Sequence, residues 1–188
     1  LLNDAIKCYE KVISIKPNLA EVHNNLGIIF SELKQLENAE ETFRQAILLN
    51  PNYAGAHYNL GNTLKDLRKI DEAEESFRKA IVINPNYAEA HNNLGNIMKS
   101  HDRLEDAEAS YRKAIAIKPD YAQAYSNLGA NLKNLGKFEE AEANCRKAII
   151  LDQKYTQAHC NLCSVLYANG DFDSAIQCIE KANSINPK

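Results

Sequence analysis

Bulky residues recur along this chain at the spacing of an α-helix. After Leu19 they occupy the fourth, seventh and eleventh positions, as His23, Leu26 and Phe30. Steps of three and four residues place these side chains on one face of a helix. A second stretch follows, in which small residues flank one large residue at the same steps. The pattern therefore predicts two amphipathic helices joined by a short turn, and such pairs run antiparallel.

The whole pattern repeats every 34 residues. The interval is marked by the prolines that close successive units, Pro17, Pro51, Pro85 and Pro119. The same interval separates the segments Asn25-Leu26-Gly27, Asn59-Leu60-Gly61, Asn93-Leu94-Gly95 and Asn127-Leu128-Gly129. This period, with two helices per unit, predicts an all-α solenoid in which each repeat packs on its neighbours. Its function is expected to lie in the surface that the stacked repeats expose.

A glycine stands at the eighth position of four units. Glycine inside a helix costs about 1 kcal/mol relative to alanine. Four glycines in register, Gly27, Gly61, Gly95 and Gly129, therefore need a reason. We expect the close approach of a neighbouring helix.

Composition narrows the classes of function. The formal net charge of −3 argues against general nucleic-acid binding, and no apolar run approaches the roughly 18 residues of a membrane span. Five irregularly spaced cysteines favour a reducing, cytoplasmic compartment. We find no phosphate-binding loop, nucleophile elbow or clustered acid pair, so no catalytic residue and no cofactor are expected.

The repeated positions resemble a tetratricopeptide repeat (TPR) array. The TPR pattern has a bulky residue at position 4, Leu-Gly at 7 and 8, and a large residue at 11. It continues with Ala at 20, an aromatic residue at 24, Ala at 27 and Pro at 32. The resemblance covers the whole chain and implies a right-handed superhelix of antiparallel helix pairs, whose first helices line a concave groove.

The pattern divides the chain into six segments of one continuous solenoid. Residues 1–19 form the second helix of a truncated repeat. Full repeats follow at 20–53, 54–87, 88–121 and 122–155, with an atypical terminal repeat at 156–188. In the last two repeats Cys145 and Ile179 replace the aromatic residue, Gln153 replaces proline and Cys163 replaces glycine. The unpartnered helix of residues 1–16 predicts end-to-end self-association.

The sixth position is asparagine in all five full repeats: Asn25, Asn59, Asn93, Asn127 and Asn161. Asparagine is a mediocre helix former, so helix stability does not explain it. Its amide both donates and accepts hydrogen bonds, and a row of amides along the groove can bind an extended peptide by its main chain. In this respect the array is similar to the TPR region of O-linked N-acetylglucosamine transferases and related bacterial arrays. Alternatively, the asparagines bridge adjacent repeats or tolerate exposure.

Two further features belong to the predicted groove. Lys65, Lys99 and Lys133 share the twelfth position and would favour acidic partners, or are simply solvated. Tyr58 is a candidate aromatic hot spot in a groove that is otherwise small and polar.

The histidines and cysteines suggest no metal site. His23, His57, His91 and His159 share the fourth position, a full repeat apart, too far to converge on one ion. We interpret them as packed side chains. Cys160 and Cys163 form a lone CxxC within a helix and lack two further ligands.

The sequence therefore predicts a non-enzymatic scaffold that binds an extended protein segment. An alternative is the substrate-recruiting TPR part of a larger transferase whose catalytic domain is absent here. RNA binding, as in pentatricopeptide arrays, is disfavoured by the Leu-Gly and Pro pattern and by the charge. Binding of a chaperone tail is disfavoured because the second position carries no lysine.

Overall fold

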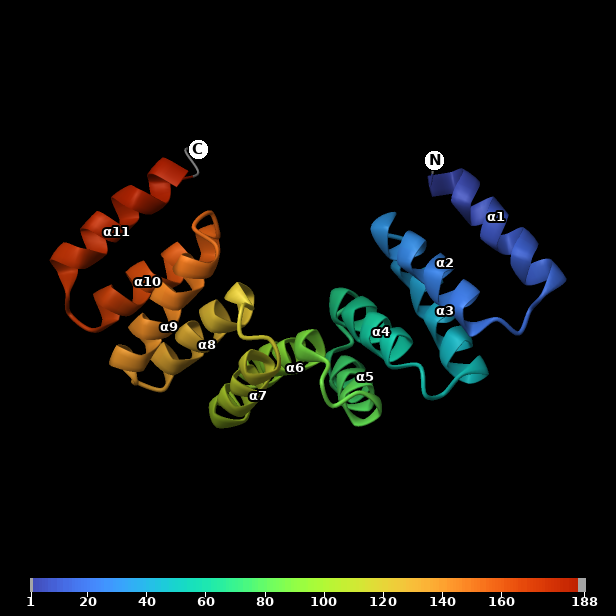
Figure 1. Cartoon of the computed structure of the whole chain (residues 1–188), viewed down its shortest axis with the longest axis horizontal. Helices are drawn as coiled ribbons and strands as arrows, with labels where there is room; N and C mark the ends of the chain where they lie inside the picture. Colours follow the sequence, from blue (N-terminus) through green and yellow to red (C-terminus); the bar gives the residue numbers. More distant parts are fainter. Residues whose placement is uncertain (1, 186–188) are drawn as a thin grey trace. The chain divides into compact units, whose positions relative to one another are not determined.

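The computed structural model describes the backbone of residues 2–185 and the side chains in that range, except those of residues 3 and 182–185. Over this range the chain contains helices and turns and no strand (Figure 1). The helices are α1 (Leu2–Ile15), α2 (Ala20–Glu32), α3 (Leu36–Leu49), α4 (Ala54–Asp66), α5 (Ile70–Ile83), α6 (Ala88–Ser100), α7 (Leu104–Ile117), α8 (Ala122–Asn134), α9 (Phe138–Leu151), α10 (Thr156–Ala168) and α11 (Phe172–Ile185). The all-α prediction is confirmed.

The chain forms two compact units, Leu1–Ala90 and His91–Lys188. In the first unit α2 packs on α3, α3 on α4 and α4 on α5; in the second, each helix from α7 to α11 packs on the next. First helices of successive pairs also meet, α2 with α4 and α8 with α10. Each unit therefore has the architecture of a TPR solenoid, with neighbour-to-neighbour packing and a face made of first helices.

Each helix pair turns at a residue in the left-handed backbone region. This residue is Lys34, Arg68, Asp102, Gly136 or Gly170, with φ between 58° and 83°. A hydrogen bond of 2.9 Å from the Gln35 amide to the Phe30 carbonyl closes the first of these turns. Such a bond satisfies a carbonyl that the helix end leaves free.

Three of the turns between pairs are held by an Asn or Asp side chain, that of Asn50, Asn84 or Asp152. Asn50 Oδ1 accepts a hydrogen bond of 3.1 Å from the Asn52 amide, in the Asx-turn pattern. In the repeat where Gln153 replaces proline, Asp152 Oδ1 accepts the equivalent bond from the Lys154 amide at 3.0 Å. The carboxylate therefore holds this turn without the restriction that proline would supply.

The core between paired helices explains the in-register glycines. Phe77 in α5 is fully buried, and a Cβ atom at Gly61 in α4 would lie 2.7 Å from its ring. Tyr111 approaches Gly95 at the same distance. The predicted close approach is confirmed: the approaching group is an aromatic ring at Gly27, Gly61 and Gly95, and it is the thiol of Cys145 at Gly129.

In the last helix pair both positions carry a different residue. Cys163 of α10 occupies the glycine position and is buried. Ile179 of α11 stands where the aromatic residue would be and is half exposed. With no ring over the glycine position, a small side chain fits there.

Carboxylates on the second helices link one repeat to the next. Glu108 of α7 accepts hydrogen bonds from Arg112 of its own helix at 2.9 Å and from Lys137, before α9, at 2.8 Å. Glu40 of α3 makes the same pair of contacts with Arg44 and Lys69. The hydrogen bond from Lys137 and the guanidinium of Arg112 hold the pKa of Glu108 below its ordinary value of 4.5.

Replacing Glu108 with glutamine is expected to lower the melting temperature at neutral pH. Because the folded-state pKa is lowered, the stabilisation is present above about pH 4.5 and is lost as the pH falls through the folded-state pKa. The difference in melting temperature between wild type and Glu108→Gln should therefore narrow from pH 7 to pH 3. Glu105→Gln, an exposed neighbour on α7, serves as control. A difference that does not change with pH would contradict this assignment.

Candidate functional site

We call the five asparagines at the sixth position the ladder asparagines. Three of them donate hydrogen bonds to the preceding repeat. Asn59 Nδ2 of α4 donates to Asn24 Oδ1 of α2 at 3.0 Å. Asn127 Nδ2 of α8 donates to Asn92 Oδ1 of α6, also at 3.0 Å. Asn161 Nδ2 of α10 donates to Ser126 Oγ of α8 at 2.9 Å. We call these three contacts, Asn24–Asn59, Asn92–Asn127 and Ser126–Asn161, the inter-repeat clasps.

The acceptors of the clasps are buried polar residues at the fifth position. Asn24 is 5% exposed, and Asn92 and Ser126 are fully buried. A buried side-chain oxygen without a partner destabilises the fold, so each clasp satisfies a group that the packing requires. Sequence analysis missed this position. The signal was a polar fifth residue inside the helix, most visible in the Asn-Asn pairs at 24–25 and 92–93.

The clasps orient the ladder amides but use only part of their hydrogen-bonding capacity. Asn59 and Asn127 are half-buried, and among the described residues their Oδ1 atoms accept no hydrogen bond. Asn161 Oδ1 differs, since it accepts from Gln157 Nε2 at 3.0 Å. Asn25 is exposed, and Asn93 Oδ1 accepts from Asn92 Nδ2 at 3.3 Å. The amides of Asn59 and Asn127 are therefore fixed acceptors at the edge of the first-helix face.

A shallow hollow adjoins one of these amides. It has a volume of about 310 Å³ and lies between α2 and α4. Asn59 lines it together with Ile28 and Asn62, which hold the ninth position of their repeats, and Glu32 and Asp66 give it a partly acidic rim. Most of the residues that line the hollow have polar or charged side chains, but Ile28, Leu36 and Phe43 also line it, so it is less polar than the sequence predicted.

The predicted lysine row has different surroundings at each member. Lys133 Nζ donates to Ser164 Oγ of α10 at 2.8 Å, so it lies along the first-helix face. Lys99 is half-buried, and burial together with the nearby Lys133 charge lowers its pKa. Lys65 lies beside Asp66 and Arg68, near the turn after α4. Lys99 and Lys133 are thus close neighbours, whereas the charge around Lys65 is mixed.

Tyr58 lies in an aromatic cluster. It occupies the fifth position, where its counterparts are the buried clasp acceptors, and it is half-buried. Its ring centroid lies 4.8 Å from that of Tyr87 and 5.9 Å from that of Phe77. Burial, and secondarily the neighbouring Tyr58, raises the pKa of Tyr87 to about 12. Much of the Tyr58 ring therefore packs against other aromatic side chains.

The histidines bind main-chain carbonyls. Nε2 of His23, His57 and His159 lies 3.0 Å from the carbonyl oxygen of Pro17, Pro51 and Gln153 respectively. Each ring thus ties the first helix to the turn before it. The interpretation of these three as packed structural side chains is confirmed.

Two of the cysteines, Cys145 and Cys163, are buried. Burial raises the pKa of Cys145 to about 12, and burial with a contact to Cys178 does the same for Cys163. Cys160 is exposed, so the CxxC pair does not share one environment. Within residues 2–185, no group of three His, Cys, Asp or Glu side chains has the geometry of a metal site. In the same range no helix is both long and apolar enough to cross a bilayer.

The family comparison agrees with the repeat pattern. The family model of the cilia and flagella-associated protein 70 C-terminal domain, a TPR domain, matches residues 1–186. No curated protein sequence is significantly similar to the chain.

Solved structures share the fold. MamA has a TM-score of 0.75 and 29% identity, over 81% of this chain and 90% of MamA. YrrB, described as a TPR protein with an unusual peptide-binding site, has a TM-score of 0.77 and 22% identity, over 96% of this chain and 93% of its own. PilF of Pseudomonas aeruginosa has a TM-score of 0.81 and 21% identity, over 90% and 78%. The last two likenesses concern the fold alone.

Proposed function

The chain belongs to the family of the cilia and flagella-associated protein 70 C-terminal domain, and from this membership we propose that it is a scaffold that binds an extended protein segment along its first helices. A TPR fold is typical of protein–protein interaction. The finer proposal is that the ladder asparagines bind the main chain of the segment.

One observation carries this proposal: the clasps fix the amides of Asn59 and Asn127 while their Oδ1 atoms accept no hydrogen bond within the described chain. An extended peptide presents main-chain N–H groups that need such acceptors. Because the clasps already restrict the amides, binding loses less side-chain entropy than it would with mobile asparagines. YrrB, which shares this fold, is described as having a peptide-binding site, so peptide binding is compatible with the fold.

We further propose that the partner segment is acidic near Lys99 and Lys133. Two neighbouring ammonium groups repel each other, and a carboxylate placed between them would relieve that repulsion. Tyr58 and Lys65, on α4 of the first unit, remain predicted partner contacts. The net charge of −3 favours a protein over a nucleic acid as partner.

Three other predictions remain proposals. The chain could be the substrate-recruiting part of a larger transferase, since nothing in the binding face distinguishes a substrate from another partner. Self-association through the ends is supported by the apolar residues that α11 exposes, Phe172, Ile176 and Ile179. Five free cysteines fit a reducing compartment such as the cytoplasm.

The binding proposal is tested by affinity capture with three baits. The first is wild type, and the second is the ladder variant Asn59→Ala/Asn127→Ala. The third is a clasp control, Asn24→Ala/Asn92→Ala, which loses the same two inter-repeat hydrogen bonds but keeps the ladder amides. We expect mass spectrometry to identify partners held by wild type and the clasp control and lost with the ladder variant. Partners held equally by all three baits would contradict the proposal that the ladder asparagines bind the partner.

A further inference from the structure

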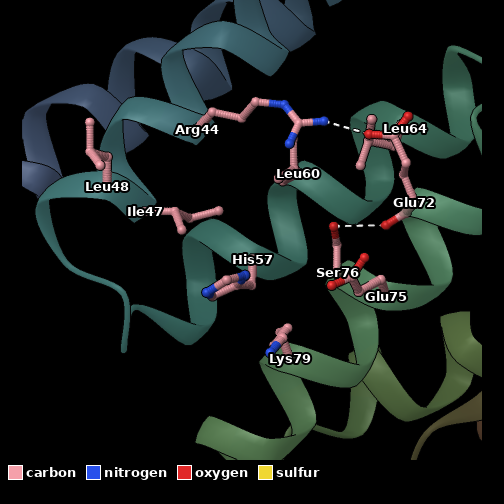
Figure 2. A pocket seen from close by; sticks show the side chains of 10 residues that line it. All are labelled: Arg44, Ile47, Leu48, His57, Leu60, Leu64, Glu72, Glu75, Ser76 and Lys79. Carbon is pink, nitrogen blue, oxygen red and sulfur yellow. Dashed lines mark hydrogen bonds and ion pairs between the residues drawn. The ribbon is translucent and has the colours of Figure 1, made fainter.

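Two hollows, each lined mainly by second helices, occupy equivalent positions three repeats apart. One, of about 350 Å³, is lined by residues of α3, α4 and α5 (Figure 2). The other, of about 360 Å³, is lined by residues of α9, α10 and α11. Each residue that lines the second lies three periods after its counterpart in the first, as Arg146 lies after Arg44. The two hollows therefore differ only where the repeats differ in sequence.

The N-terminal hollow supplies its own carboxylate. Arg44 donates to Glu40 of its own helix at 2.9 Å and to Glu72 of the next pair at 2.6 Å, across the hollow (Figure 2). Arg112 repeats this arrangement in the second unit, with Glu140 at 2.7 Å. In both cases the guanidinium binds one acid within its helix and one from the following repeat.

The C-terminal hollow lacks this second acid. Ser174 stands where Glu72 and Glu140 stand in their repeats, and Gln177 stands in place of Glu75. Arg146 donates from Nε to Glu142 Oε1 at 2.8 Å. Within the described residues its two terminal amino groups donate no hydrogen bond.

The lining of the C-terminal hollow includes the basic side chains of Arg146 and Lys181 and no carboxylate. Glu142 and Asp171 lie near Arg146 outside the hollow, and the charge of Arg146 helps to lower the pKa of Asp171, after the hydrogen bonds from Ser174. Neither of these two acids lines the hollow.

The interior of the same hollow is apolar. Leu162 and Leu166 form a buried floor, and Ile150 stands beside it with 69% of its surface exposed. A side chain that enters here would remove this apolar surface from water, which is favourable. The site therefore joins an aliphatic floor to a guanidinium with unused donors.

We propose that this hollow binds a partner segment in which a carboxylate adjoins an aliphatic side chain. The carboxylate binds Arg146 as Glu140 binds Arg112, and the aliphatic group covers Leu162 and Leu166. The partner thus supplies the acid that Ser174 does not. This surface is separate from the asparagine ladder, so either proposal can fail without the other.

The test uses N-acetyl-leucine, which carries both groups, and its neutral analogue N-acetyl-leucinamide. NMR titration in the millimolar range follows the methyl signals of Leu162 and Leu166 and the Nε–H signal of Arg146. We expect saturable shifts with N-acetyl-leucine and about fivefold weaker binding of the amide, as for an exposed charge pair. Arg146→Gln should remove that preference.

The matched variants Ser174→Glu and Ser174→Gln decide the role of the missing acid. Ser174→Glu restores an internal carboxylate and should abolish the preference for N-acetyl-leucine, whereas Ser174→Gln, of similar size and no charge, should keep it. The ladder variant should bind both probes like wild type. Absence of a saturable shift, equal affinity for the two probes, or a preference that survives Ser174→Glu would overturn the proposal.

Discussion

Replacing Gly61 with alanine is expected to lower the free energy of unfolding by up to about 2 kcal/mol. The new Cβ atom would lie 2.7 Å from Cε1 and 2.8 Å from Cδ1 of Phe77, a ring that is fully buried and cannot move aside. Overpacking of this kind costs about 1–3 kcal/mol. The better helix propensity of alanine offsets about 1 kcal/mol of it.

The matched control is Gly55→Ala on the same helix. A Cβ atom there would meet only the ring of Tyr53, at 3.2 Å, so alanine should be neutral or stabilising. Denaturant unfolding of wild type and the two single variants gives the comparison. If Gly61→Ala were as stable as Gly55→Ala, the close packing of α4 on α5 would not be the reason for glycine at this position.

Breaking the clasp between α6 and α8 should have a comparable effect. Asn92→Ala and Asn127→Ala are each expected to cost about 2 kcal/mol, because either change leaves a partly or fully buried polar group unpaired. The double variant should lose about 1 kcal/mol less than the sum of the two, since both changes remove the same bond.

A double-mutant cycle by denaturant unfolding measures that difference. Asn134→Ala, an exposed residue at the end of α8, is a control that should show no coupling to Asn92. Additive effects of Asn92→Ala and Asn127→Ala would mean that the hydrogen bond between their amides does not contribute.

The fold could be predicted from the sequence because its determinants repeat. Gly61, Phe77 and their equivalents recur every 34 residues, and only packed helix pairs explain that register. Exchanges such as Cys163 with Ile179 look like defects in one repeat and are understood only when both helices are seen together.

The candidate site could be predicted only in part. Periodicity places Asn59 and Asn127 on a helix face, but it does not say which neighbour their amides contact. The polar fifth residues Asn24 and Asn92 are visible in the sequence, but the groups that they contact depend on how adjacent repeats stack. The absence of an acid at Ser174 is likewise recognised only by comparison with the Arg112–Glu140 pair at the equivalent position.

The most direct test of the central claim is the dissociation constant of a captured partner segment for three proteins: wild type, the ladder variant Asn59→Ala/Asn127→Ala and the clasp control Asn24→Ala/Asn92→Ala. Two main-chain hydrogen bonds of about 1 kcal/mol each predict roughly thirtyfold weaker binding by the ladder variant. The clasp control should lose less affinity than the ladder variant, because its ladder amides remain although the clasps no longer orient them. Equal affinity of wild type and the ladder variant would contradict main-chain recognition by the asparagines.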